Sequence, residues 1–80
     1  MRRIGKMKVT IKLFGVLRID QFKEEAREYL PGTIVQEVLV DLNIPLNLLG
    51  TILINGVHAG DKEKLHDGDN LWLLPILCGG

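Results

Sequence analysis

The stretch Met7-Lys8-Val9-Thr10-Ile11-Lys12-Leu13 alternates strictly between apolar and polar side chains. Because successive side chains of a strand point to opposite faces, the alternation predicts a β-strand with one buried face and one solvated face. The whole chain has 80 residues, enough for one small domain. We place this domain at residues 7–75, between a basic N-terminal appendage at 1–6 and a flexible C-terminal tail at 76–80.

The segment after this strand, residues 22–30, has an ambiguous pattern. Its composition favours a helix, whereas the alternation of its side chains is also compatible with a strand. We predict a strand that pairs with residues 7–13, because a lone strand would leave its backbone hydrogen-bonding groups unpaired. Pro31-Gly32 ends the segment in either case.

A helix is predicted to begin at Thr33, since Thr33 and Gln36 have the spacing of a capping box. Asn43 and Pro45 end it. The apolar stripe that should face the core consists of Ile34, Val35, Val38, Leu39 and Leu42.

The second half of the sequence predicts a hairpin and a final strand. Residues 51–54 are apolar, and Asn55-Gly56 is a strong signal for a two-residue type I′ turn, which needs positive φ at both positions. Residues 61–67 should be irregular, with Leu65 as an inward anchor. Residues 70–74 form the last strand, and Pro75 ends it.

The predicted element order is strand, strand, helix, strand, short strand, strand. One helix packed across one face of a four- to five-stranded mixed sheet satisfies the need to bury an apolar face of each element. A right-handed crossover then brings the last strand beside the first. This is an α+β fold of the β-grasp, ubiquitin-like type.

Composition excludes several functional classes. Ten basic and ten acidic residues give a net charge of zero, which argues against nucleic-acid binding. The single cysteine cannot form an internal disulfide, and no apolar run approaches the ~20 residues needed to span a membrane. The N-terminus lacks the apolar stretch of a signal peptide, so we expect a cytoplasmic protein.

The sequence contains little that is typical of an enzyme active site. His58 and His66 lie near predicted turns and have no metal-ligand or nucleophile spacing. The Asp67-Gly68-Asp69 run lacks the remaining ligands of a calcium loop and is explained as a turn. We therefore predict a non-catalytic protein with no bound cofactor and no metal.

The chemistry is expected at the end of the chain, Leu77-Cys78-Gly79-Gly80. Residues without a Cβ can thread a narrow channel in another protein, and the carboxylate of Gly80 is free of steric cover. A carboxylate becomes a good electrophile once a partner adenylates it with ATP. Attack by sulfide then gives a thiocarboxylate, and attack by an amine gives an amide.

These features resemble the MoaD/ThiS-like sulfur-carrier family, and within it the small subunit of molybdopterin synthase. The resemblance covers residues 7–80 and is carried by Lys12-Leu13-Phe14-Gly15-Val16-Leu17-Arg18, Pro31-Gly32-Thr33-Ile34, Ile54-Asn55-Gly56, Leu65-His66-Asp67-Gly68-Asp69 and Pro75 to Gly80. It implies that a ubiquitin-activating-type enzyme adenylates Gly80, which then bears the sulfur, and that Gly79 gives a slim approach. It also implies insertion of the tail into a molybdopterin synthase large subunit. The family's tail has a second proline and a small residue where this chain has Ile76 and Cys78.

Several alternatives stay open: a sulfur carrier of the thiamin, cysteine or tungsten-pterin type, a ubiquitin-like modifier joined to proteins through Gly80, and a non-covalent interaction module. Cys78 is either a tolerated small side chain or a thiol that reacts with the activated Gly80. Because a carrier must dock before it presents its tail, we also predict a partner interface on the exposed sheet face, formed by Phe14, Leu71, Trp72, Leu73 and Pro75.

Overall fold

The computed structural model describes residues 5–76. Along the chain the elements are β1 (Met7–Leu13), the 3-10 helix η1 (Gly15–Arg18), β2 (Glu24–Tyr29), α1 (Val35–Asp41), the 3-10 helix η2 (Leu46–Leu48), β3 (Leu49–Ile54), β4 (Val57–His58) and β5 (Asn70–Pro75). The predicted order of strands and helix is confirmed. The first strand begins at Met7, as expected, and the last strand, predicted for residues 70–74, extends one residue further to Pro75.

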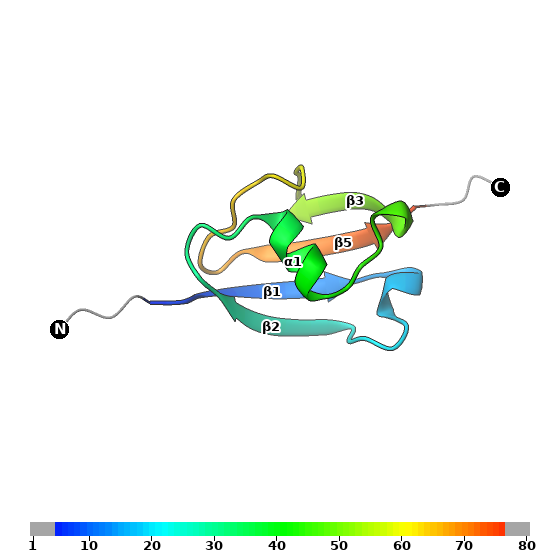
Figure 1. Cartoon of the computed structure of the whole chain (residues 1–80), viewed down its shortest axis with the longest axis horizontal. Coiled ribbons are helices and arrows are strands. Elements are labelled where there is room, and N and C mark those ends of the chain that lie inside the picture. The colour runs from blue at the N-terminus through cyan, green and yellow to red at the C-terminus, as the bar shows by residue number, and fades with distance from the viewer. Residues whose placement is uncertain (1–4, 77–80) are drawn as a thin grey trace.

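The five strands form one mixed sheet in the order β2-β1-β5-β3-β4, and α1 crosses one of its faces (Figure 1). β1 and β5 are parallel, and every other neighbouring pair is antiparallel. The last strand therefore lies in the middle of the sheet, between the first strand and the third. This arrangement matches the predicted fold, and it places the strand that leads into the C-terminal tail in the middle of the sheet, where it is paired on both sides.

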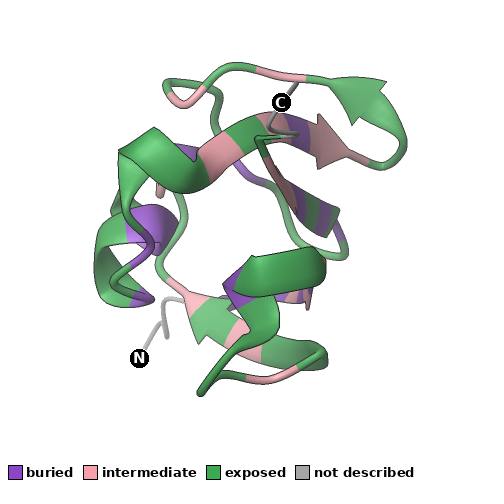
Figure 2. Cartoon of the chain, turned by 90° about the vertical axis from the view of Figure 1, so that its right-hand side faces the viewer, coloured by how far each residue is buried: buried purple, intermediate pink, exposed green. Residues whose placement is uncertain are grey.

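The core lies between α1 and the sheet. Buried and exposed residues alternate along the central strands, and the outer side of α1 is exposed (Figure 2). The core consists of Met7, Val9, Ile11, Leu13, Leu17, Val35, Val38, Leu39, Leu42, Ile44, Ile52, Leu65, Leu71 and Leu73. Packing of these aliphatic side chains holds the described part of the chain together.

Residues 24–29 form a strand in spite of their helical composition, because all six pair with residues of β1. Arg27 and Tyr29 lie on the helix side of β2 and both contact Asp41 at the end of α1: Arg27 Nη1 is 3.3 Å from Asp41 Oδ2, and the Tyr29 hydroxyl donates to the same oxygen at 3.2 Å. Burial, followed by the nearby Asp41 carboxylate, raises the pKa of Tyr29 to about 12. This polar contact ties the edge strand to the helix.

The helix begins two residues later than predicted. Ile34 stays extended because it forms an isolated bridge with Lys64, so α1 starts at Val35. Glu37, and not Gln36, reaches back: its Oε1 accepts the Ile34 amide N–H at 2.9 Å. The Thr33 hydroxyl instead donates to the Leu30 carbonyl at 2.7 Å. The prediction of a Thr33–Gln36 capping box is therefore wrong, because a tertiary contact sets the start of the helix.

The Asn55-Gly56 turn is confirmed, with φ values of 53° and 84°. Asn55 also connects the turn to β5: its Nδ2 donates to Asp69 Oδ1 and its Oδ1 accepts the Asn70 amide N–H, each at 2.9 Å. Asp69 further accepts the His66 amide N–H at 2.8 Å. Leu65 is buried as predicted. The segment before β5 thus has no helix or strand but is fixed by hydrogen bonds.

Candidate functional site

The tail that carries the predicted chemistry leaves the fold at the end of β5. Pro75 is the last residue of that strand, and the Ile76 amide N–H donates to the Leu48 carbonyl at 2.8 Å. Leu77, Cys78, Gly79 and Gly80 lie outside the described residues. The described chain therefore fixes the point from which the tail starts, at the right-hand end of β5 in Figure 1.

Two short helices flank this exit. η1 follows β1 and η2 precedes β3, and both lie at the same end of the molecule as the end of β5 (Figure 1). They expose the large apolar side chains of Val16, Leu46 and Leu48, and Ile76 is itself about half exposed. Exposed apolar side chains therefore lie near the start of the tail.

An aromatic pair lies on the sheet face opposite α1. The rings of Phe14 and Trp72 are 5.7 Å apart and tilted by 56°. The Lys12 ammonium lies 5.3 Å from the centre of the Phe14 ring and 5.4 Å from that of Trp72. Such distances are typical of cation–π contacts. We call Lys12, Phe14 and Trp72 the aromatic patch; it combines apolar area with one fixed positive charge.

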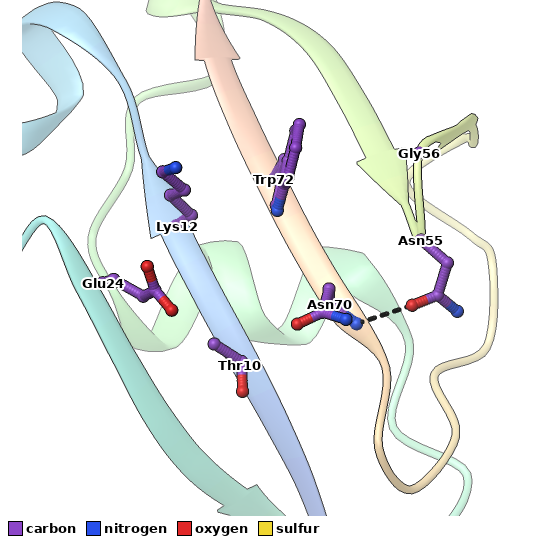
Figure 3. Close-up of a pocket in the computed structure, with 7 residues that line it drawn as sticks. All are labelled: Thr10, Lys12, Glu24, Asn55, Gly56, Asn70 and Trp72. Carbon is purple, nitrogen blue, oxygen red and sulfur yellow. Dashed lines mark hydrogen bonds between the residues drawn. The ribbon is translucent and has the colours of Figure 1, made fainter.

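A shallow hollow of about 480 Å³ adjoins this patch on the same face (Figure 3). It is lined by Thr10, Lys12, Glu24, Asn55, Gly56, Asn70 and Trp72. Its rim carries a cation from Lys12 and a carboxylate from Glu24. The outer face therefore combines aromatic, polar and charged side chains.

The predicted interface needs one correction. Leu71 and Leu73 are fully buried under α1, at 0% exposure, so they do not lie on the outer face, and their assignment to a partner interface is wrong. Trp72 lies between them in β5 and points the other way, with 36% of its surface exposed. Phe14 and Pro75 are partly exposed and remain candidates. Lys12 was missed, although its alternation with Leu13 already placed it on the outer face.

The two histidines are exposed, and His66 Nδ1 is 3.8 Å from Asp69 Oδ2. Within residues 5–76 no group of three or more His, Cys, Asp or Glu side chains is placed to hold a metal ion. In the same range no helix is long and apolar enough to cross a membrane. Asp67 and Asp69 accept backbone N–H groups of Lys8 and His66, which accounts for the Asp67-Gly68-Asp69 turn.

The sequence matches no protein-family model and no curated protein. Solved structures do match. A putative molybdopterin converting factor subunit 1 from Pyrococcus furiosus is 23% identical with a TM-score of 0.74, and the alignment covers 89% of this chain and 99% of that one. Small archaeal modifier protein 1 of Haloferax volcanii is 21% identical with the same TM-score and the same coverage. The chain has the ubiquitin-like β-grasp fold.

A third match is part of an assembly. The complex of subunits 1 and 2 of the molybdopterin-converting factor from Helicobacter pylori contains a chain that is 23% identical, with a TM-score of 0.65. The alignment covers 92% of this chain and all of that one. At these identities the similarity establishes the β-grasp fold and leaves the function to be argued from the residues of this chain.

Proposed function

We propose that this β-grasp protein is a sulfur carrier whose Gly80 carboxylate is activated and converted to a thiocarboxylate. The observation that carries the proposal is the position of the Gly79-Gly80 pair, which lies four and five residues after Pro75, the last residue of the strand at the centre of the sheet. A folded domain followed by two glycines, which have no side chains, is suited to deliver a carboxylate into the active site of another protein.

The chemistry requires a partner that supplies both ATP and an active site. The Gly80 carboxylate attacks the α-phosphate of ATP and releases pyrophosphate, which gives an acyl-adenylate. Sulfide then attacks the acyl carbon and AMP leaves, so that one carboxylate oxygen is replaced by sulfur. No group of the carrier itself takes part in either step except the carboxylate. The carrier is the non-catalytic component, and a ubiquitin-activating-type enzyme is the partner.

The aromatic patch is the proposed docking surface for such partners. Trp72 lies three residues before Pro75 in β5, so it lies about 10 Å from Pro75, the residue before the tail, at the usual rise of a strand. Phe14 directly precedes η1, which flanks the exit. A partner that covers this patch is therefore placed to receive the tail. Aromatic side chains at the centre of an interface contribute a large share of binding energy.

The acceptor of the sulfur is proposed to be a molybdopterin precursor, bound by a large subunit. Support comes from the motifs around Phe14 and Pro75 and from the fold shared with subunit 1 of two molybdopterin-converting factors, one of them in complex with subunit 2. Ile76 and Cys78 depart from the tail of that family. They bear on which partner is used and leave the proposed carrier chemistry unchanged.

A second function, conjugation to proteins, uses the same activated carboxylate. Here the amine of a lysine replaces sulfide as the nucleophile and gives an isopeptide bond. The similarity to small archaeal modifier protein 1 favours conjugation to proteins. It does so as strongly as the similarity to the molybdopterin-converting factors favours sulfur transfer. Higher-mass bands that carry an epitope-tagged form of the chain in cell extracts would identify it, whereas a carrier alone gives none.

The test is ATP–pyrophosphate exchange with an adenylating enzyme from the same organism. The full chain should support exchange, and deletion of Gly80 should abolish it while the circular dichroism spectrum stays unchanged. Trp72→Ala should raise KM for the carrier by about tenfold or more, because it removes an aromatic anchor. Val57→Ala, a substitution of an exposed residue on β4, is the matched control and should leave KM unchanged. Exchange that persists without Gly80 would refute the proposal.

A further inference from the structure

We infer that Gly15 and Gly50 form a glycine collar around Pro75, which fixes where the tail starts and in which direction it leaves the fold. The inference rests on the proposed function, because it concerns delivery of the Gly80 carboxylate. It assigns a positioning role to two residues that lie far from Gly80 in the sequence and contribute no reactive group.

Gly50 lies directly against the backbone at the exit. A Cβ built on Gly50 would lie 2.8 Å from the Pro75 carbonyl oxygen and 2.9 Å from both the amide nitrogen and the Cα of Ile76. These are backbone atoms, which cannot rotate away as the end of a side chain can. The register between β3 and β5 also shifts at this point, between Leu49 and Thr51. Only glycine allows the two strands to approach so closely there.

Gly15 packs against Pro75 on the side of the exit where β1 ends. Its φ is +58°, a conformation that L side chains rarely adopt, and its Cβ would lie 3.0 Å from Pro75 Cγ and 3.6 Å from Cδ. The backbone turn into η1 therefore packs against the proline ring. Because the ring fixes φ of Pro75, contact with the ring also restrains the direction of the chain.

A backbone hydrogen bond completes the arrangement one residue further on. The Ile76 amide N–H donates to the Leu48 carbonyl at 2.8 Å, so η2 holds the residue that follows Pro75. Gly80 lies four residues beyond Ile76, a span of at most about 14 Å when the chain is fully extended. With so short a reach, a change in the start or the direction of the tail displaces Gly80 from the position at which it must react.

The collar also has an energetic consequence. With Pro75 and Ile76 already fixed, a partner that receives the tail does not have to order these two residues. If the collar opens, the partner must also order Pro75 and Ile76, and each additional residue costs backbone entropy. The expected effect of a disrupted collar is a fall of about tenfold or more in kcat/KM for activation of the carrier.

The experiment compares Gly50→Ala with Gly32→Ala. Gly32 has a φ of +94° and no atom within 4 Å of its Cβ position, so alanine there strains the backbone without touching the exit. It lies beyond β2, at the end of the sheet where Tyr29 pairs with Met7, away from Pro75. Each full-length variant is measured for thermal stability, for hydrogen exchange of the Ile76 amide and for the KM and kcat of ATP–pyrophosphate exchange.

Gly50→Ala should speed exchange of the Ile76 amide and lower kcat/KM, whereas Gly32→Ala should lose stability without either effect. If Gly50→Ala does not fold, Gly15→Asn replaces it, because asparagine tolerates positive φ while its Cβ still meets the Pro75 ring. Equal kcat/KM values for the collar variant and Gly32→Ala would overturn the collar. A wild-type chain that supports no ATP–pyrophosphate exchange would instead overturn the proposed function. Hydrogen exchange of the Ile76 amide would then test the collar alone.

Discussion

Leu71→Ala and Trp72→Ala should affect different properties of the protein, although the two residues are neighbours in β5. Leu71 is fully buried and pairs with Ile11 of β1 and with Ile54 of β3, so it packs at the centre of the core beneath α1. Trp72 points to the outer face, where it meets Phe14 and Lys12. The first substitution should therefore reduce stability strongly, and the second should mainly reduce partner binding.

The magnitude follows from burial. Truncating a fully buried leucine to alanine costs about 2–5 kcal/mol, because the transfer energy is lost and a cavity remains. A domain of this length has a total stability of roughly 4–12 kcal/mol, so the substitution removes a large fraction of it. The corresponding fall in Tm is about 10 °C or more. Trp72→Ala removes a side chain that is already 36% exposed and leaves no enclosed cavity, so its cost should be smaller.

Urea denaturation followed by far-ultraviolet circular dichroism measures both variants, since it does not depend on Trp72 fluorescence. Leu74→Ala, at a half-buried position of the same strand, serves as an intermediate control. The assignment of faces would be wrong if Trp72→Ala lost more stability than Leu71→Ala. It would also be wrong if Leu71→Ala cost less than about 1 kcal/mol, a value typical of exposed sites.

Two further substitutions test the contacts that fix β2 and the hairpin. Because burial and Asp41 raise the pKa of Tyr29 from 10.0 to about 12, unfolding releases its proton between these values, and stability should fall as pH rises through that window. Tyr29→Phe should remove this fall, seen as equal urea midpoints at pH 9 and 11, and a persistent fall would contradict the assignment. Asn55→Ala should cost about 1–3 kcal/mol, since it removes the donor to Asp69 Oδ1 and the acceptor of the Asn70 amide N–H. Asn55→Gly, which keeps the turn, separates this loss from the backbone preference; identical stability of Asn55→Gly and wild type would show that the side-chain bonds contribute nothing.

Much of the fold could be predicted because the sequence pattern and the tertiary structure agree. The alternation of residues 7–13 and the Asn55-Gly56 turn are local signals, and the structure keeps them without change. Residues 24–29 needed a tertiary argument, because only pairing with β1 makes a strand of a segment with helical composition. The predicted start of α1 was wrong by two residues for the same kind of reason: Lys64, distant in sequence, holds Ile34 extended.

The candidate site was only partly predictable. The Gly79-Gly80 pair and the aromatic residues are visible in the sequence, but the face on which each residue of β5 lies depends on how the strand sits between β1 and β3. Leu71 and Leu73 were therefore assigned to the wrong surface. The contacts of Gly15 and Gly50 with Pro75 join three segments that are distant in the sequence, and neither spacing nor composition indicates them.

The mass of the C-terminal peptide after reaction tests the central claim most directly. The full chain is incubated with the adenylating enzyme, ATP and a sulfur donor. The peptide that contains Gly80 is then isolated, and its mass is measured by mass spectrometry. The account predicts a gain equal to the difference between one sulfur and one oxygen atom, placed on Gly80 and retained in Cys78→Ser. A gain of one whole sulfur atom that maps to Cys78, or no change in the presence of an active enzyme, would contradict it.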